Sequence, residues 1–253
     1  MLKIVIIGTG NISYHLCKAI IETKNLKLIE VFGRKKNPPK DLFNNISYCN
    51  NIKKIQKADL YILCVSDNAI SKISDELNIN KNSIVVHTSG STNMKLLSKH
   101  KNHGIIYPLQ TFTSNANVNF SEIPICIETY HQEDLLLLQE LGKSISNNVQ
   151  IVTSTQREHI HLSAVIVNNF VNHLYLIGQD LLVNQSLTFD ILKPLIFETA
   201  TKIKNISPHK TQTGPAKRND LKTIEKQLHL LKDSPYQELY KNITNSILEK
   251  YKH

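Results

Sequence analysis

Two glycines near the start of the chain are spaced as in a dinucleotide-binding turn. Gly8 and Gly10 follow an apolar run and open a stretch with helical spacing, and Ser13 stands where a third glycine often lies. The first glycine permits a tight turn, and the second lets the backbone approach a pyrophosphate that the helix N–H groups bind. The turn residues predicted to bind a cofactor are Gly8, Thr9, Gly10, Asn11 and Ile12. The alternative is a glycine turn that binds nothing.

The tip of the second predicted strand indicates which dinucleotide binds. An acidic residue at this tip holds the ribose 2′-hydroxyl of NAD, whereas arginine accommodates the 2′-phosphate of NADP. Glu30 lies inside the strand, and the tip itself is Gly33 followed by Arg34, Lys35 and Lys36. We therefore expect NADP(H) in preference to NAD(H), with Arg34 and Lys35 as contacts. A solvated basic loop is the alternative.

Three further strand ends carry short polar side chains. In an open α/β sheet, ligands bind beyond the carboxyl ends of the strands. Asp67 follows one strand and equally suits the N-cap of a helix, and His87 equally suits a hydrogen-bonded histidine at a strand end. The predicted cofactor contacts here are Val65, Ser66 and Asp67, and the predicted substrate contacts are Thr88, Ser89 and Gln110.

A long uncharged segment, Gln156–Leu182, is a candidate for the catalytic helix. Helical spacing places His161, Asn168 and Asn172 on one face, opposite an apolar face predicted to be buried. Histidine is the residue type that ordinarily titrates near neutrality, which makes His161 the candidate acid or base, while Asn168 and Asn172 would orient a substrate. The alternatives are a buried helix with satisfied amides and, for His161, a hydrogen-bonded interior histidine.

The segment from Gln212 to Asp220 forms a second candidate site. Gly214 followed by Pro215 predicts a helix beginning at the proline. An open helix N-terminus beside Arg218 suits a substrate carboxylate or phosphate. The predicted substrate contacts are Gln212, Gly214 and Arg218, and a capped helix with surface charges is the alternative.

The pattern of apolar runs places these residues on an α/β domain followed by helices. Strands are predicted at 3–7, 27–32, 60–65, 83–87, 104–107, 123–128 and 149–152, with amphipathic segments between several of them. The rest of the chain is predicted to contain only helices, at 156–182, 190–206, 215–231 and from 235 onward. The predicted domains are a doubly wound parallel sheet of the Rossmann type at 1–153 and an all-α domain at 154–253.

Composition narrows the function. The net charge of +9 is spread over both predicted domains without an aromatic-interleaved basic patch, so we expect no nucleic-acid partner. Purely apolar runs are far shorter than the ~20 residues of a membrane span, so no membrane partner is expected. The four cysteines are isolated and lack metal-ligand spacing, which predicts no metal and a reduced, cytoplasmic setting.

With these motifs in place, the chain resembles a bacterial family of Rossmann-like proteins with a C-terminal domain of unknown function, the DUF2520 family. The resemblance rests on the segments 8–13, 65–70, 87–91, 107–112, 161–175 and 212–220. It implies a helical domain similar to that of 6-phosphogluconate dehydrogenase, distant kinship with pyrroline-5-carboxylate reductase, ketopantoate reductase and prephenate dehydrogenase, and a homodimer. Gln227 departs from the family, where histidine is expected.

These features together predict an NADP(H)-dependent oxidoreductase. It would transfer hydride to or from a small, anionic carbonyl or imine compound, with a neighbouring group exchanging the proton. Related dehydrogenases often place a lysine on the helix after the Rossmann domain, and this chain has none between Gln156 and Asp180. A protein that binds or senses NADP(H) without turnover is therefore the alternative. A prephenate-dehydrogenase-like enzyme, suggested by the segment 107–112, is a third hypothesis.

Overall fold

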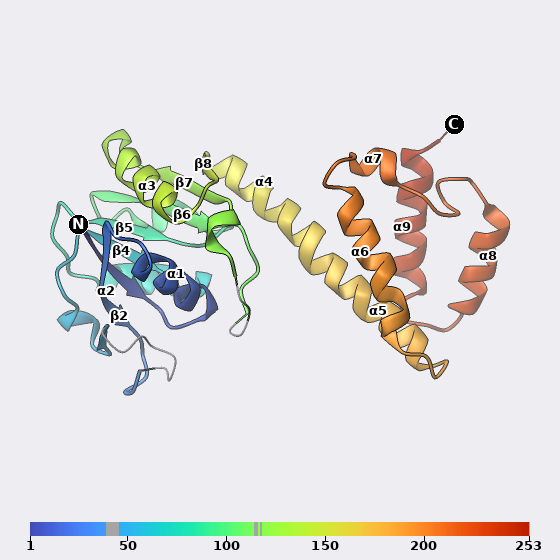
Figure 1. The fold of residues 1–253 in the computed structure, drawn as a ribbon, viewed down its shortest axis with the longest axis horizontal. Helices are drawn as coiled ribbons and strands as arrows, with labels where there is room; N and C mark the ends of the chain where they lie inside the picture. Colours follow the sequence, from blue (N-terminus) through green and yellow to red (C-terminus); the bar gives the residue numbers. More distant parts are fainter. Residues whose placement is uncertain (39–45, 114–115, 117, 253) are drawn as a thin grey trace. The chain divides into compact units, whose positions relative to one another are not determined.

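The computed structural model describes residues 1–38, 46–113, 116 and 118–252 (Figure 1). Contacts divide it into two compact units, Met1–Val167 and Asn168–His253, which are described separately. The sequence places the division after residue 153. The contacts instead assign helix α4 (Ser154–Ala164) to the first unit, because its Arg157 is fully buried there.

An eight-stranded sheet forms the centre of the first unit, in the order β3-β2-β1-β4-β5-β6-β7-β8. Its strands are β1 (Leu2–Ile7), β2 (Leu26–Phe32), β3 (Ser47–Cys49), β4 (Leu60–Leu63), β5 (Ile84–His87), β6 (Asn102–Pro108), β7 (Ile125–Thr129) and β8 (Val149–Ile151). The predicted α/β class is confirmed. Neighbouring strands pair in parallel except β6 and β7, whose antiparallel pairing the sequence pattern did not indicate. The short β3 was also not predicted.

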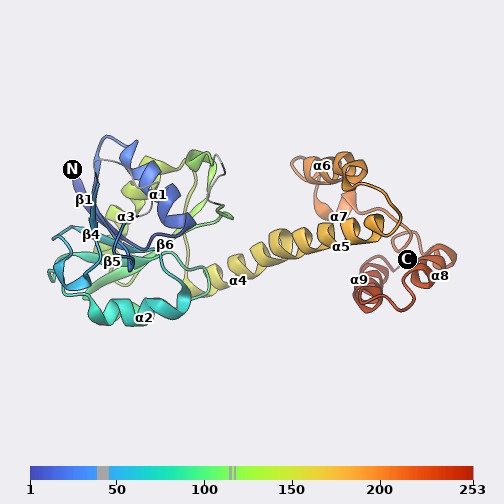
Figure 2. The same cartoon turned by 90° about the horizontal axis from the view of Figure 1, so that it is seen from below.

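Helices cover both faces of this sheet. On one face α1 (Asn11–Ile21) and α3 (Gln132–Ile145) contribute Leu16 and Leu138 to a shared core, and on the other α2 (Asp67–Glu76) contributes Ile70 (Figure 2). Strand β1 is consequently buried on both sides, which explains its continuous apolar run. Because helices cover both faces of the sheet, the ends of its strands are the part open to a ligand.

The strand order reverses next to β1. The chain proceeds from β1 through β2 to β3 on one side and then returns to place β4 on the other side of β1. Ligands of open α/β sheets bind at such a switch point, outside the carboxyl ends of the strands. Gly8 follows β1 and Val65 follows β4, so both predicted cofactor segments lie at this position.

The second unit consists of helices. They are α5 (Val171–Val183), α6 (Lys193–Lys202), α7 (Pro208–Thr211), α8 (Leu221–Leu230) and α9 (Gln237–Lys250). Helix α4 reaches α5 through a π-helical segment, Val165–Phe170. The continuous helical stretch Ser154–Val183 is long and apolar enough to cross a membrane by length and composition alone, a property that core helices of soluble proteins share.

The predicted burial of the apolar face on this stretch is wrong for the single chain. Leu162 and Phe170 are each 57% exposed, and Val167 is 69% exposed. Ile177, by contrast, is buried, because the helices of the second unit pack on α5 around it. The π-helical turn also interrupts the regular 100° spacing on which the predicted polar and apolar faces rest.

Candidate functional site

The turn after β1 has the geometry that a pyrophosphate site requires. Gly8 has a φ of +126°, and a Cβ there would lie 2.0 Å from the carbonyl oxygen of Cys64. Gly10 is the N-cap of α1 without a side-chain cap, and a Cβ there would meet nothing within 4 Å. The N–H groups of the first turn therefore lack a side-chain cap, and such N–H groups can bind an anion. Ser13 is buried and donates to the Gly8 carbonyl at 2.7 Å.

Glu30 is unavailable for a ribose. It is buried, and its Oε2 accepts from the backbone N–H of Gln56 at 2.8 Å. Its Oε1 accepts from the Ser47 hydroxyl at 3.2 Å and from the Gln56 side chain at 3.3 Å. The carboxylate thus joins β2 to its neighbours, in keeping with its place inside the strand.

The basic tip of β2 lies against the glycine turn. A Cβ on Gly33 would lie 2.6 Å from Thr9 Cγ2 and 2.6 Å from Tyr48 Oη. The Tyr48 hydroxyl donates to the Lys35 carbonyl at 2.7 Å and so fixes the course of the tip. Arg34 and Lys35 are exposed, so both cations can meet a phosphate beside the turn.

The polar ends of β4 and β5 are joined by hydrogen bonds. Ser66 is the N-cap of α2, which places Asp67 in the first turn rather than at the cap. Asp67 Oδ2 accepts from the Ser91 hydroxyl at 2.7 Å. Burial opposes ionisation of Asp67, but hydrogen bonds from Ser91, Ser89 and Thr92 outweigh it and hold its pKa below the usual value. Val65, just before, is half-buried.

The predicted substrate contacts after β5 are already engaged within the protein. Thr88 is buried and its hydroxyl donates to the Leu63 carbonyl at 3.3 Å. Ser89 donates its hydroxyl to Thr92 Oγ1 at 2.8 Å and its backbone N–H to His87 Nδ1 at 3.2 Å. Burial, and then the charge of Arg157, lower the pKa of His87 to about 4. His87 is accordingly a neutral strand-end histidine whose Nδ1 is engaged, while its buried Nε2 has no hydrogen-bond partner among the described residues.

Arg157, which the sequence did not single out, is fully buried in the first unit. Its Nη1 donates to the Gly90 carbonyl at 2.7 Å and to the Ser89 carbonyl at 3.3 Å. Its Nε lies 3.5 Å from Glu128 Oε2, and the other Glu128 oxygen accepts from the Ser154 hydroxyl at 2.7 Å. One guanidinium therefore ties α4 to the loop after β5 and to β7. Its position as the last cation before an uncharged helical segment is the signal that could have identified it.

His161 lies one helical turn after Arg157 and contacts β6. The Tyr107 hydroxyl and His161 Nδ1 are 3.1 Å apart, with Tyr107 buried and His161 half-buried. The other two predicted catalytic residues, Asn168 and Asn172, belong to the second unit and are exposed.

Gln110 lies on the loop after β6, and Asn11 is the first residue of α1. Gln110 is exposed, and its Oε1 accepts from the backbone N–H of Thr111 at 2.8 Å. Asn11 Nδ2 donates to the Phe112 carbonyl at 2.9 Å, which holds the β6–β7 loop against the start of α1. The remaining turn residue, Ile12, packs on the core.

The predicted helix start at Pro215 is wrong. Helix α8 begins at Leu221, and Asp220 is its N-cap, accepting from the backbone N–H of Thr223 at 3.1 Å. The carboxylate of Asp220 therefore closes the N-terminus of α8. The segment before this helix forms turns, with Gly214 at a φ of +101°. Gln212 and Arg218 lie on this turn segment, Arg218 exposed, and a substrate role for them stays a prediction.

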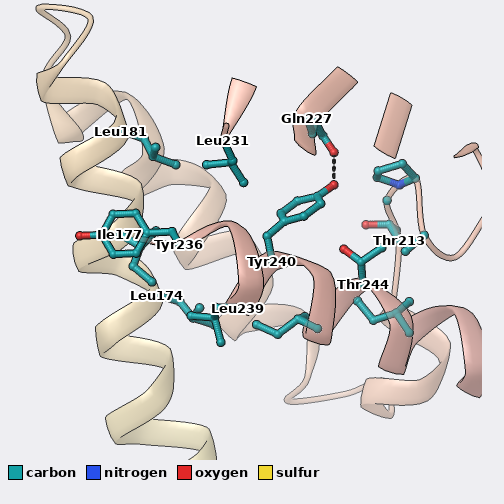
Figure 3. Close-up of a pocket in the computed structure, with 15 residues that line it drawn as sticks. Leu174, Ile177, Leu181, Thr213, Gln227, Leu231, Tyr236, Leu239, Tyr240 and Thr244 are labelled. Carbon is teal, nitrogen blue, oxygen red and sulfur yellow. Dashed lines mark hydrogen bonds between the residues drawn. The ribbon is translucent and has the colours of Figure 1, made fainter. Parts of the chain in front are cut away.

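An apolar cavity of about 270 Å³ lies within the second unit (Figure 3). Leu174 and Ile177 of α5 line one side, and Tyr240 of α9 lines another. The Tyr240 hydroxyl donates to Gln227 Oε1 at 2.5 Å, so the glutamine that departs from the family pattern is occupied by a neighbouring phenol. Among the described residues, no three His, Cys, Asp or Glu side chains are grouped as metal ligands.

Comparison with known proteins agrees with this architecture. Residues 123–247 match the family model of a domain of unknown function, DUF2520. Residues 3–90 match the model described as NADP oxidoreductase coenzyme F420-dependent. A search of curated protein sequences gave no match.

Solved structures extend the comparison to the whole chain. A Bacteroides fragilis protein described as an NADP oxidoreductase is 35% identical, with a TM-score of 0.89 and 98% of both chains covered. A Plasmodium falciparum pyrroline carboxylate reductase with NADP bound has a TM-score of 0.62 at 12% identity, covering 99% of this chain and 97% of that one. A Streptomyces aurantiacus imine reductase has a TM-score of 0.69 at 10% identity, covering 97% and 93%. The last two likenesses concern the fold alone.

The sheet, the glycine turn and the helical second unit define an oxidoreductase of the Rossmann type that uses a nicotinamide cofactor. The chain belongs to the family of the Bacteroides NADP oxidoreductase, Rossmann-like proteins with a C-terminal DUF2520 domain.

Proposed function

We propose that this protein is an NADPH-dependent reductase, or the reverse dehydrogenase, acting on a small anionic carbonyl or imine compound. The observation that carries the proposal is the uncapped start of α1 at Gly10, next to the exposed cations of the β2 tip. Bound NADPH would supply hydride. Gly8 and Gly10 would bind its pyrophosphate, and Arg34 and Lys35 its 2′-phosphate.

Support for the substrate class comes from two sources. The relatives of similar fold include proteins named pyrroline carboxylate reductase and imine reductase, whose names indicate a C=N group. The turn segment before α8 carries the exposed Arg218, which suits an anionic group on the substrate. The buried free cysteines Cys17, Cys64 and Cys126 support a reducing, cytoplasmic setting.

Cofactor choice can be measured directly. Replacement of Arg34 by Ala should raise the Kd for NADPH about tenfold, equivalent to about 1.4 kcal/mol, and leave the Kd for NADH unchanged. Lys81→Ala is the matched control, because Lys81 is an exposed cation just before β5, at the opposite edge of the sheet. Calorimetric titration of wild type and both variants would give the four constants. Equal affinity of the wild type for the two cofactors would contradict the NADP preference.

Turnover separates the reductase from a protein that only binds NADP(H). Absence of lysine between Gln156 and Asp180 favours the binding protein. Loss of absorbance at the NADPH band would be followed with a panel of cyclic imines and keto acids. Tight NADPH binding without oxidation of NADPH by any member would favour the sensing protein.

We also propose a homodimer in which a second copy covers the exposed apolar residues of the Ser154–Val183 helix. Leu162, Val167 and Phe170 lie within nine positions of one another, each more than half exposed. Exposed large apolar side chains gathered within one helical stretch mark a candidate interaction site. Identical copies meet through the same patch on each subunit, which makes a second chain the simplest occupant.

Sedimentation equilibrium tests the dimer. Phe170→Asp should give a monomer at concentrations where the wild type is a dimer, because it places a charge in the apolar interface. Leu136→Asp is the matched control, since Leu136 is 68% exposed on α3 and belongs to no such patch. A dimeric Phe170→Asp variant would contradict the assigned face.

A further inference from the structure

Tyr107 and His161 form a polar pair inside the first unit. They come from β6 and α4, are separated by 54 positions in the sequence, and bring Oη and Nδ1 within 3.1 Å. We propose that this pair delivers the proton of the reaction. His161 is the catalytic residue, giving the proton from Nε2, and Tyr107 is a positioning residue whose oxygen accepts from Nδ1–H. This inference rests on the proposed function.

The backbone is shaped to let the pair form. A Cβ on Gly90 would lie 2.6 Å from His161 Nδ1 and 2.7 Å from Tyr107 Cζ, so no larger residue fits beneath the contact. Arg157 binds the carbonyl oxygens of Ser89 and Gly90 and precedes His161 by one turn of the same helix. The fully buried guanidinium of Arg157 thus holds in place both the loop at Gly90, which lies against the pair, and the helix that carries His161.

The direction of the hydrogen bond follows from the charge states that the histidine passes through. A protonated imidazole can only donate from Nδ1, whereas a phenol oxygen can accept in every state of the ring. The contact therefore persists through the proton cycle only if Tyr107 accepts. Burial keeps the pKa of Tyr107 above its usual value, so the phenol stays neutral.

The charged and titratable groups around the pair are few among the described residues. Cys126 of β7 and Arg157 of α4 act on Tyr107, and Glu128 of β7 is paired with Arg157. The Glu128 carboxylate is therefore engaged with the guanidinium and the Ser154 hydroxyl. That arrangement leaves the imidazole of His161 as the group in this cluster able to give up a proton and take one back.

Reduction of an imine would use the pair in the following way. With NADPH as the hydride donor, which would be oxidised to NADP⁺, the substrate carbon would accept the hydride, the π electrons of the C=N bond would move to nitrogen, and nitrogen would take the proton that leaves His161 Nε2. The ring becomes the neutral Nδ1–H tautomer, still donating to Tyr107, and Nε2 takes its next proton from water. Nε2–H is the tautomer that histidine ordinarily favours, so the Nδ1–H form at neutral pH is a specific signature.

Nitrogen NMR of the full chain with ¹⁵N-labelled histidine reads this signature without a substrate. His161→Asn identifies the His161 signals by their loss. The wild type should show neutral His161 protonated at Nδ1, and Tyr107→Phe should convert it to the Nε2–H form. A wild-type ring protonated at Nε2, or signals that Tyr107→Phe leaves unchanged, would overturn the proposal.

Two glycine variants add a test that removes neither functional group. Gly90→Ala should displace the pair and reproduce the tautomer change of Tyr107→Phe. Gly178→Ala is the control, because a Cβ there meets its nearest neighbour, Leu192, at an ordinary 3.5 Å. An unchanged His161 spectrum in Gly90→Ala would count against the pair.

On a substrate identified by the NADPH oxidation panel, Tyr107→Phe should lower kcat about tenfold, and His161→Asn about a hundredfold or more. The KM for NADPH should stay constant in both variants, because neither residue contacts the cofactor turn. An unchanged kcat in His161→Asn would overturn the proposal. A failure to bind NADPH would instead refute the proposed function and leave the tautomer result intact.

Discussion

Acidification should destabilise the first unit through His87, which the fold holds neutral. His87 is fully buried, and its Nδ1 accepts from the Ser89 backbone N–H, so a proton on Nδ1 removes that hydrogen bond and faces the charge of Arg157. Its pKa is about 4 in the folded protein, against 6.5 for an ordinary histidine. The folded value is the lower one, so the stability is complete above pH 6.5 and is lost as the pH falls toward 4.

The size of the loss follows from the two pKa values of His87. Each pKa unit corresponds to about 1.36 kcal/mol, so the full loss below pH 4 is about 3.4 kcal/mol, and about 2 kcal/mol is lost between pH 7 and pH 5. Urea unfolding of the full chain at these two pH values would measure the free energy of unfolding. His100, also buried, contributes with the same sign, because burial lowers its pKa.

The variant His87→Asn isolates this one group. Asparagine Oδ1 can accept from the Ser89 N–H as Nδ1 does, but it does not titrate. The free energy of unfolding of His87→Asn should fall by about 2 kcal/mol less than that of the wild type between pH 7 and pH 5. Parallel losses in the two proteins would refute the assignment of the pH dependence to His87.

Two further substitutions test the anchor and the glycine turn. Arg157→Met should lower the free energy of unfolding by about 3–5 kcal/mol, because it leaves Glu128 and two carbonyl oxygens without their buried partner; urea unfolding would measure this, and a loss below about 1 kcal/mol would contradict it. Gly8→Ala should abolish NADPH binding and destabilise the fold by about 3 kcal/mol or more, since the positive φ is strained for alanine and its Cβ would overlap the Cys64 carbonyl. Calorimetry and urea unfolding would check both effects, with Gly178→Ala as the matched control, and a Gly8→Ala variant that binds NADPH normally would refute the assigned turn.

The local sequence pattern was sufficient to predict those parts of the structure that depend only on neighbouring residues. The glycine turn is a property of a few consecutive positions, because Gly8 needs its φ and Gly10 its missing side chain whatever lies elsewhere. The strands could be located because β1 and β4, buried on both faces, read as continuous apolar runs. The position of Glu30 inside its strand likewise indicated that the carboxylate would not face a ribose.

Helical spacing was a poorer guide where the helix itself changes. The π-helical segment Val165–Phe170 breaks the regular repeat, so a face drawn through His161 and Asn168 is not continuous. Spacing also records that one face is apolar without recording what covers it. Leu162 and Phe170 are exposed in the single chain, an outcome that the spacing alone could not indicate.

What the sequence by itself determined is therefore the class of fold, the glycine turn and His161 as a candidate. Tertiary structure alone decided how that histidine is held. Tyr107 reaches it from β6, Gly90 from the loop after β5, and Arg157 ties the helix to that loop. Contacts between residues so far apart in the sequence arise from strand order and helix packing, which no spacing pattern records.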